Sequence, residues 1–167
     1  FVLGPLYNDG MVNRNRWVLL AYRIPREPST PRISVWRKLR RLGAAQVVDG
    51  LVALPLDAKN REQLDWIAEE IFDAGGDASV WTAEPTTAAQ ERAIARQLTL
   101  AVAEEYAALV ESANTAGRGG AVPDRRTLAR LRRELRQIEG RDYFNAAGRR
   151  EARVAVERLA KAAELRR

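Results

Sequence analysis

The sequence predicts an α+β fold, in which a βαββαβ sandwich precedes a helical region of about three helices. In residues 14–84, short apolar runs bounded by Gly, Pro and Asp alternate with amphipathic helical patterns. After Pro85, apolar residues recur only at helical spacing. A length of 167 residues, of which 46% are hydrophobic, suits one domain of ordinary size with a smaller unit appended.

The first strand is predicted at residues 17–24, WVLLAYRI. A nearly continuous apolar run that is closed by a proline is typical of a strand buried on both faces of a sheet. In the loop that follows, Ser29 or Thr30 is expected to cap the next helix. Residues 1–13 are interpreted as a leader or a cloning remnant, with Met11 as the natural start.

A basic amphipathic helix and a hairpin come next. At 100° per residue, the helix at 32–42 gathers its apolar side chains on one side, and these are Val35, Trp36, Leu39 and Leu42. Gly43 is suited to end this helix in the left-handed conformation. Asp49 and Gly50 form a strong two-residue turn signal between strands at 44–48 and 51–54.

A second helix and a fourth strand complete the sandwich. Asp57 or Asn60 opens the helix, an apolar stripe runs from Leu64 to Phe72, and the strand ASVWT follows at 78–82. This order is that of a ferredoxin-like sandwich, in which two helices cover one face of an antiparallel sheet. We therefore predict a ferredoxin-like domain at 14–84.

The remainder, residues 85–167, is predicted to be helical. Thr86 or Thr87 caps a helix that runs to about residue 115, and a second helix starts at Pro123-Asp124. A third carries apolar residues at the same spacing after Gly140. Leucines alternating by three and four indicate a coiled-coil-like seam, so these helices are expected to pack on one another or on a second subunit.

Positive charge is concentrated on two of the predicted helices, and the chain carries a formal net charge of +6. Arginine pairs in a two-point manner with phosphate oxygens, so these faces are candidates for binding nucleic acid. On the first helix the residues are Arg37, Lys38, Arg40 and Arg41, and on the helix after Pro123 they are Arg125, Arg126, Arg130, Arg132, Arg133 and Arg136.

Each of these assignments has an alternative. The basic faces are also compatible with solvated surfaces whose charges are matched by acids from neighbouring helices. Arg32, on the inward side of its helix, is either an anion site at the loop or a buried partner of an acid such as Asp49. The indoles of Trp36, Trp66 and Trp81 either stack on bases or pack in the core or at its rim.

Catalysis has little support in the sequence. With no Cys and no His, the chain lacks thiolate nucleophiles, Cys/His zinc sites and histidine acid–base chemistry, and we predict no metal and no cofactor. Small ferredoxin-like dimers include metal-dependent nucleases of the Cas2 type, but the expected carboxylate is missing from the end of the first strand, Tyr22-Arg23-Ile24. Asp49 and Asp57 are better explained as turn and cap residues. We therefore predict that the chain is not an enzyme.

Several segments together resemble the N-terminal region of ChrB, the regulatory protein of bacterial chromate-resistance operons. They are RWVLLAYRIP, PSTPRISVWRKLRRLGAAQVVDGLVALP, GGDASV and ARLRRELRQIEGRDYFNAAGRREARVAVERLA, which places the resemblance over residues 14–165. It implies a regulator that binds a promoter and responds to chromate. Full-length members continue into a second domain, to which chromate sensing is usually assigned.

The leading hypothesis is thus a cytoplasmic, dimeric, DNA-binding regulatory domain without a membrane segment. No run approaches the roughly 20 apolar residues that a membrane span requires. The alternative is a non-catalytic dimerisation or interaction module that acts through a partner domain, and the remote alternative is the nuclease.

Overall fold

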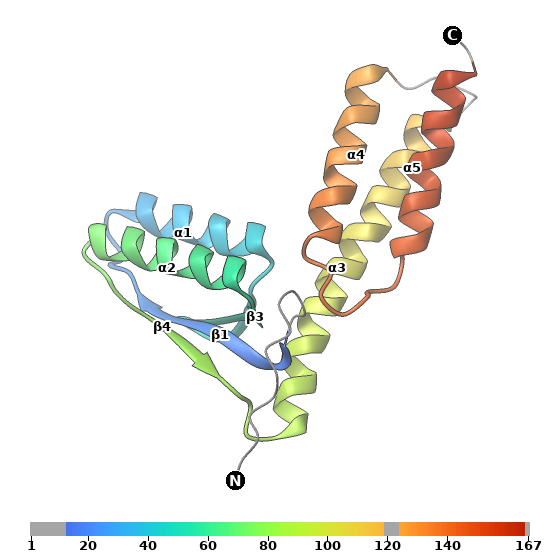
Figure 1. Ribbon diagram of the computed structural model, residues 1–167. Helices are drawn as coiled ribbons and strands as arrows, with labels where there is room; N and C mark the ends of the chain where they lie inside the picture. Colours follow the sequence, from blue (N-terminus) through green and yellow to red (C-terminus); the bar gives the residue numbers. More distant parts are fainter. Residues whose placement is uncertain (1–12, 119–123, 166–167) are drawn as a thin grey trace. The chain divides into compact units, whose positions relative to one another are not determined.

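The computed structural model describes residues 13–118 and 124–165 (Figure 1). The chain divides into two compact units, an α/β unit that ends at Glu91 and a helical unit that begins at Arg92. The predicted leader lies outside the described residues except for Asn13, where the first strand already begins.

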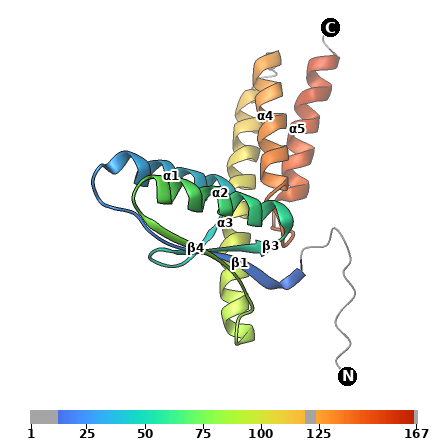
Figure 2. The ribbon, with the colours of Figure 1, turned by 60° about the vertical axis from the view of Figure 1, so that its left-hand side comes forward.

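The α/β unit has the predicted order of strands and helices. Its elements are β1 (Asn13–Arg23), α1 (Ser29–Leu42), β2 (Ala45–Val48), β3 (Leu51–Leu56), α2 (Ala58–Asp73) and β4 (Asp77–Ala83). The four strands form one sheet in the order β2-β3-β1-β4, and every neighbouring pair is antiparallel. In both ribbon views α1 and α2 lie side by side over the same face of this sheet (Figures 1 and 2).

The core of this unit lies between the sheet and the two helices. Val18 and Leu20 of the central strand β1 are fully buried, and they are paired with Leu54 and Val52 of β3. The stripe of α2 is buried as predicted from Leu64 to Ile71, but its last predicted member, Phe72, is 55% exposed. The apolar β1 run is therefore explained by its central place between β3 and β4.

Two local predictions for α1 were wrong. The helix begins at Ser29 after Pro28, and neither Ser29 nor Thr30 caps it with its side chain. Trp36, expected on the inward side, is 53% exposed, while Val35 and Leu39 are buried. Trp36 stands about 100° from Val35 on the helical wheel, at the margin of the inward arc. The Gly43 stop was confirmed, with φ +71°.

The hairpin turn is tied to the neighbouring strand. Gly50 has φ +75°, and its carbonyl accepts a hydrogen bond of 2.7 Å from the backbone N–H of Tyr22 in β1. A Cβ atom at Gly50 would lie 2.6 Å from the carbonyl oxygen of Tyr22. Glycine is therefore required here both for its backbone conformation and for the close approach of two strands.

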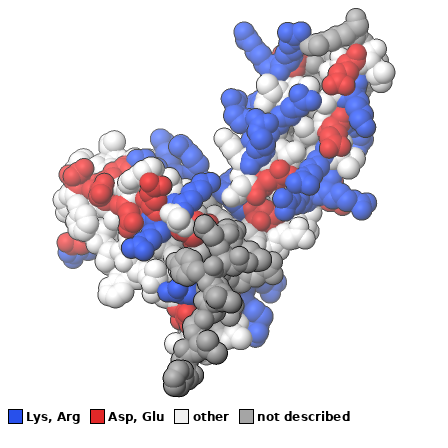
Figure 3. All heavy atoms as spheres, in the orientation of Figure 1, with Lys and Arg blue, Asp and Glu red and all other residues white. Residues whose placement is uncertain are grey.

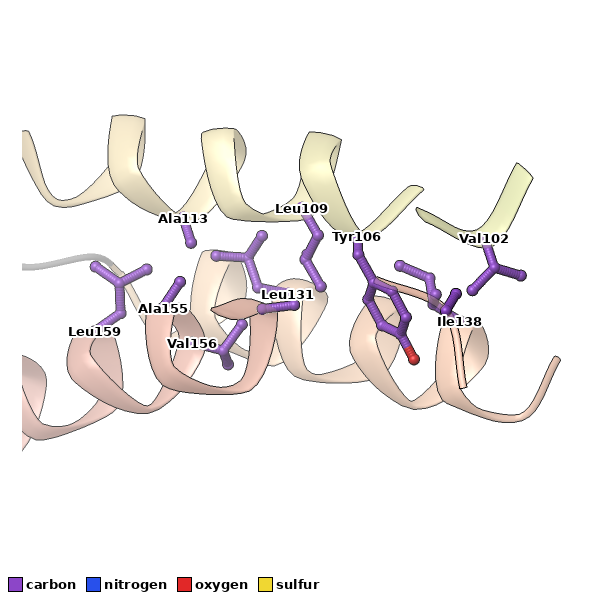
Figure 4. Packing of buried hydrophobic residues seen from close by; sticks show 11 residues of the cluster. Val102, Tyr106, Leu109, Ala113, Leu131, Ile138, Ala155, Val156 and Leu159 are labelled. Atoms are coloured by element: carbon purple, nitrogen blue, oxygen red, sulfur yellow. The ribbon is translucent and has the colours of Figure 1, made fainter. Parts of the chain in front are cut away.

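The helical unit contains α3 (Ala88–Ala116) from Arg92 onward, α4 (Arg125–Glu139) and α5 (Arg149–Glu164). Side chains from all three helices form one buried cluster around Tyr106, Leu109, Leu131 and Ile138 (Figure 4). Thr87 caps α3 and Asp124 caps α4, since their side-chain oxygens accept backbone N–H groups of the first turn. The three helices thus pack on one another, which is one of the two alternatives that the helical spacing left open.

Replacing Gly50 by alanine should cost more stability than the same change at Gly75, which also has φ +75° but where an added Cβ atom would meet nothing within 4 Å. We expect roughly 1 kcal/mol for Gly75→Ala and at least about 2 kcal/mol for Gly50→Ala, because only the latter adds a steric clash. Urea unfolding followed by tryptophan fluorescence reports on the α/β unit, since all four Trp lie in it. Equal losses would contradict the close approach to Tyr22.

Candidate nucleic-acid interface

Helix α1 leaves its basic side chains exposed to solvent because its apolar side is narrow. Val35 and Leu39 are its only buried residues, and the helix contains no Asp or Glu. Five basic side chains are consequently left exposed, namely Arg32, Arg37, Lys38, Arg40 and Arg41. Four of them form the first predicted phosphate-binding set.

The neighbouring helix α2 neutralises one member of that set. Lys38 forms an ion pair with Glu70, whose carboxylate also accepts a hydrogen bond of 2.8 Å from the Ser34 hydroxyl. Burial opposes ionisation of Glu70, but the hydrogen bonds from Lys38 and Ser34 outweigh it and hold the pKa of this carboxyl below its usual range. For Lys38, the observed arrangement is therefore the alternative in which an acid of a neighbouring helix matches the charge.

The other α1 cations have different surroundings. The guanidinium carbon of Arg40 lies 5.0 Å from the centre of the Trp36 ring, a cation–π arrangement. Arg37 and Arg40 form no ion pair with any described residue. Arg41 lines a groove of about 240 Å³ between α1 and α2, together with Lys38 and Trp66.

Arg32 is exposed and forms no ion pair within the described part of the chain. The suggested partner Asp49 is itself exposed and instead accepts a hydrogen bond of 3.2 Å from Gln46. A buried pair of Arg32 with Asp49 is therefore excluded, and an anion site at Arg32 stays a prediction. Asp57 caps α2 by accepting the Asn60 N–H at 2.6 Å, as expected.

Helix α4 carries the second predicted set. Leu131 and Ile138 are buried against α3 and α5, and all six arginines of the helix are exposed. Arg130 pairs with Glu134 at 3.3 Å. The remaining five form no ion pair with residues that the structure describes, and these are Arg125, Arg126, Arg132, Arg133 and Arg136.

Some arginines outside this face of the helical unit are matched to acids. Arg141 bonds Glu105 at 2.5 Å, and Arg153 bonds Glu139 at 2.5 Å. Figure 3 shows Lys and Arg side chains over much of the visible face of this unit, with acidic side chains between them. Arg150 and Arg158 of α5 form no ion pair with described residues either, so unmatched charge is most concentrated on α4 but is not confined to it.

A buried polar contact holds the turn that follows α4. The Tyr106 hydroxyl donates a hydrogen bond of 3.1 Å to Asp142, which also accepts the Ala146 N–H at 2.7 Å and lies 3.8 Å from Arg149. Burial and the neighbouring Asp142 charge raise the pKa of Tyr106 to about 12. This contact joins α3 to the end of α4 and so helps to fix the position of the arginine face.

The sequence underestimated the exposure of three tryptophans. Trp36, Trp66 and Trp81 are 53%, 55% and 60% exposed. Packing in the core or at its rim was the favoured interpretation because each stands at helical or strand spacing among apolar residues. Their spacing could not distinguish the inward arc from its margin, and the structure leaves all three available for contacts at the surface.

Neither a metal centre nor a membrane-spanning helix is found in the described residues. Across 13–118 and 124–165, no three carboxylates lie close enough to hold a metal ion. None of the helices in these ranges combines the length and apolar character needed to cross a membrane. The α/β unit and the helical unit each carry an exposed basic helix.

The family model described as "Protein ChrB, N-terminal" matches residues 32–116. This is just over half of the chain, which therefore belongs to the ChrB N-terminal family. The resemblance inferred from the sequence is confirmed for that range. The matched range includes most of α1 and all of α3, while β1, α4 and α5 lie beyond it. Neither the curated proteins nor the solved structures gave a match.

Replacing Tyr106 by phenylalanine should remove a pH dependence at high pH. The pKa of the Tyr106 phenol is about 12 in the folded chain, whereas it is about 10 in the unfolded chain. Stability from this group is therefore complete below pH 10 and is lost as the pH rises to 12, by roughly 2–3 kcal/mol. Urea unfolding followed by circular dichroism measures it in both proteins.

At lower pH the variant should differ from the parent by a constant of about 1 kcal/mol, the value of a lost hydrogen bond. If the difference between the two proteins does not shrink between pH 10 and 12, the Tyr106–Asp142 contact does not shift this titration.

Proposed function

We propose that this chain is a ChrB-like regulatory domain of chromate resistance that binds DNA through arginine-rich helix faces. The observation that carries the proposal is the outer face of α4, where five of six arginines form no ion pair with a described residue. Unmatched guanidinium groups repel one another, and a polyanion relieves this repulsion. Membership of the ChrB N-terminal family supplies the context.

Phosphate contacts explain binding and positioning but not sequence recognition. Arginine forks pair with phosphate oxygens and release the counterions that surround DNA, which makes affinity strongly dependent on salt. Such contacts fix the register of a protein on the duplex without reading bases. The promoter specificity implied by the family resemblance would need further contacts to the base edges.

Helix α1 is proposed as the second DNA-contacting face. Arg37 and Arg40 are its strongest members because they lack carboxylate partners in the described chain. Arg41 and Lys38 line the neighbouring groove, and Glu70 offsets the charge of Lys38. We further propose that the α/β unit is a ferredoxin-like sandwich, an assignment supported by its antiparallel strand order β2-β3-β1-β4.

Chromate remains a proposed effector by family resemblance. It is an oxyanion, so an exposed guanidinium such as that of Arg32 is chemically suited to it. A cytoplasmic location and a homodimer are proposed on the same footing. Adding chromate to the DNA titrations below separates a direct effect on this chain from one that needs the second domain of full-length members.

An interaction module is the second candidate function, favoured by the exposure of large apolar side chains in the α/β unit such as Trp66, Phe72 and Trp81. A stable dimer by light scattering, with no affinity for DNA at low salt, would support it over DNA binding. The nuclease alternative is tested by incubating labelled RNA and DNA with Mg²⁺ or Mn²⁺, where cleavage would support it.

Removing α4 arginines should weaken binding to duplex DNA and flatten its dependence on salt. For the triple change Arg125→Ala, Arg132→Ala and Arg136→Ala, the slope of log K against log salt should fall by roughly 2.7, or about 0.9 for each phosphate contact. The double change Arg37→Ala and Arg40→Ala on α1 should lower it by roughly 1.8. Fluorescence anisotropy at several salt concentrations gives both values.

The matched control replaces three exposed arginines that already have acidic partners. These are Arg23, Arg61 and Arg118, which pair with Asp77, Asp65 and Glu111. This variant loses the same formal charge as the α4 triple variant. If it weakens binding equally, net charge alone explains the affinity and the assigned α4 face is wrong.

Neutralising Glu70 should strengthen DNA binding, because Lys38 would lose its carboxylate partner. We expect Glu70→Gln to raise affinity by roughly threefold at low salt and to steepen the salt slope by about 0.9. Glu69→Gln is the control, since Glu69 is exposed on the same helix and has no ion pair in the described chain. Equal effects of both changes would count against a phosphate contact by Lys38.

A further inference from the structure

The three exposed tryptophans of the α/β unit differ in their electrostatic surroundings. Trp66 lies on α2, one helical turn from the acids Glu62 and Glu70. Trp81 lies on the edge strand β4 and donates its indole N–H to the Ser79 hydroxyl at 2.8 Å. Trp36 lies on a helix without any acid, and the charged residues one turn before and after it, Arg32 and Arg40, are both positive.

Two arginines flank Trp36 along the same helix. Arg32 and Arg40 stand four residues before and after it, so the three side chains form one row along α1, about 12 Å long. Arg40 already lies over the ring at 5.0 Å, while Trp36 stays 53% exposed. Arg32 is exposed and without an ion pair in the described chain. The row alternates a charge that suits phosphate with a flat surface that suits a base.

We propose that the row Arg32–Trp36–Arg40 binds unpaired nucleotides of a single strand, with a base stacked on Trp36 and the flanking phosphates at the two arginines. This inference rests on the proposed function and deepens it. In a duplex, the faces of the bases are covered by their neighbours, and an indole has no access to them. Aromatic side chains interspersed with arginine are how proteins hold single strands without sequence preference.

Arg32 thereby gains a role that neither DNA duplex binding nor the α1 set assigns to it. The side chain lies apart from Lys38 and Arg41, which border the groove toward α2. On the helical wheel, Arg32 and Trp36 are about 40° apart, whereas Lys38 is about 160° from Trp36. The α1 surface therefore has two sides, one lined by the groove and Glu70, and one by the Arg32–Trp36–Arg40 row.

The test compares two labelled single strands of equal length in anisotropy titrations of the full chain at low salt. One is an oligothymidylate, and the other has the same sugar–phosphate backbone with abasic residues. The base-bearing strand should bind roughly five- to 100-fold more tightly, the range expected for a base stacked on an aromatic ring. Trp36→Ala should abolish this preference, and Trp36→Phe should retain most of it.

Trp66→Ala and Trp81→Ala are the matched controls, because these residues are as exposed as Trp36. Both variants should keep the preference for the base-bearing strand, and circular dichroism checks that each variant is folded. Equal binding of the two strands, or an equal effect of Trp66→Ala and Trp36→Ala, would overturn the stacking role. If both strands and the duplex bind equally with a steep salt dependence, the proposed function stands without it. If none of them binds, both proposals fail.

Discussion

The narrowness of the buried stripe on α1 and α4 is the constraint on which both basic faces depend. Each helix buries only two residues, Val35 and Leu39 in α1, and Leu131 and Ile138 in α4. An apolar anchor of this size is enough to seat a helix while most of its circumference stays in water. Charge can therefore accumulate on the outer arc without any penalty from burial. The same geometry leaves Trp36 exposed at the margin of the stripe of α1.

Periodicity in the sequence was sufficient for most of the fold. The order of strands and helices in the α/β unit, the Gly43 stop and the Asp57 and Asp124 caps all follow from local patterns that the structure reproduces. Local patterns failed at the starts of some elements, where contacts with other parts of the chain determine the boundary. Pro28 rather than Ser29 or Thr30 precedes α1, and the strand β1 extends back to Asn13.

The candidate site was less predictable because ion pairs join distant parts of the chain. Glu70 contacts Lys38 from another helix, 32 positions away in the sequence, and the spacing of residues within α1 does not predict this ion pair. Arg32 shows the opposite error. Its inward angle on the helical wheel suggested a buried ion pair with Asp49, and this pair does not form. Exposure of a single side chain depends on which neighbour covers it. Burial patterns are therefore predicted well for stripes and poorly for residues at their edges.

Like charges one turn apart on α4 have a consequence for the effect of ionic strength on the helix itself. Arg132 and Arg136 are spaced by four residues, as are Arg126 and Arg130, and such pairs destabilise a helix by about 0.2–0.5 kcal/mol each. Dissolved salt screens this repulsion. The isolated chain should therefore hold α4 more firmly in concentrated electrolyte than in dilute buffer. Polyanions in the cell would reduce this repulsion in the same way at a much lower concentration, so α4 would be most rigid with a polyanion bound to it.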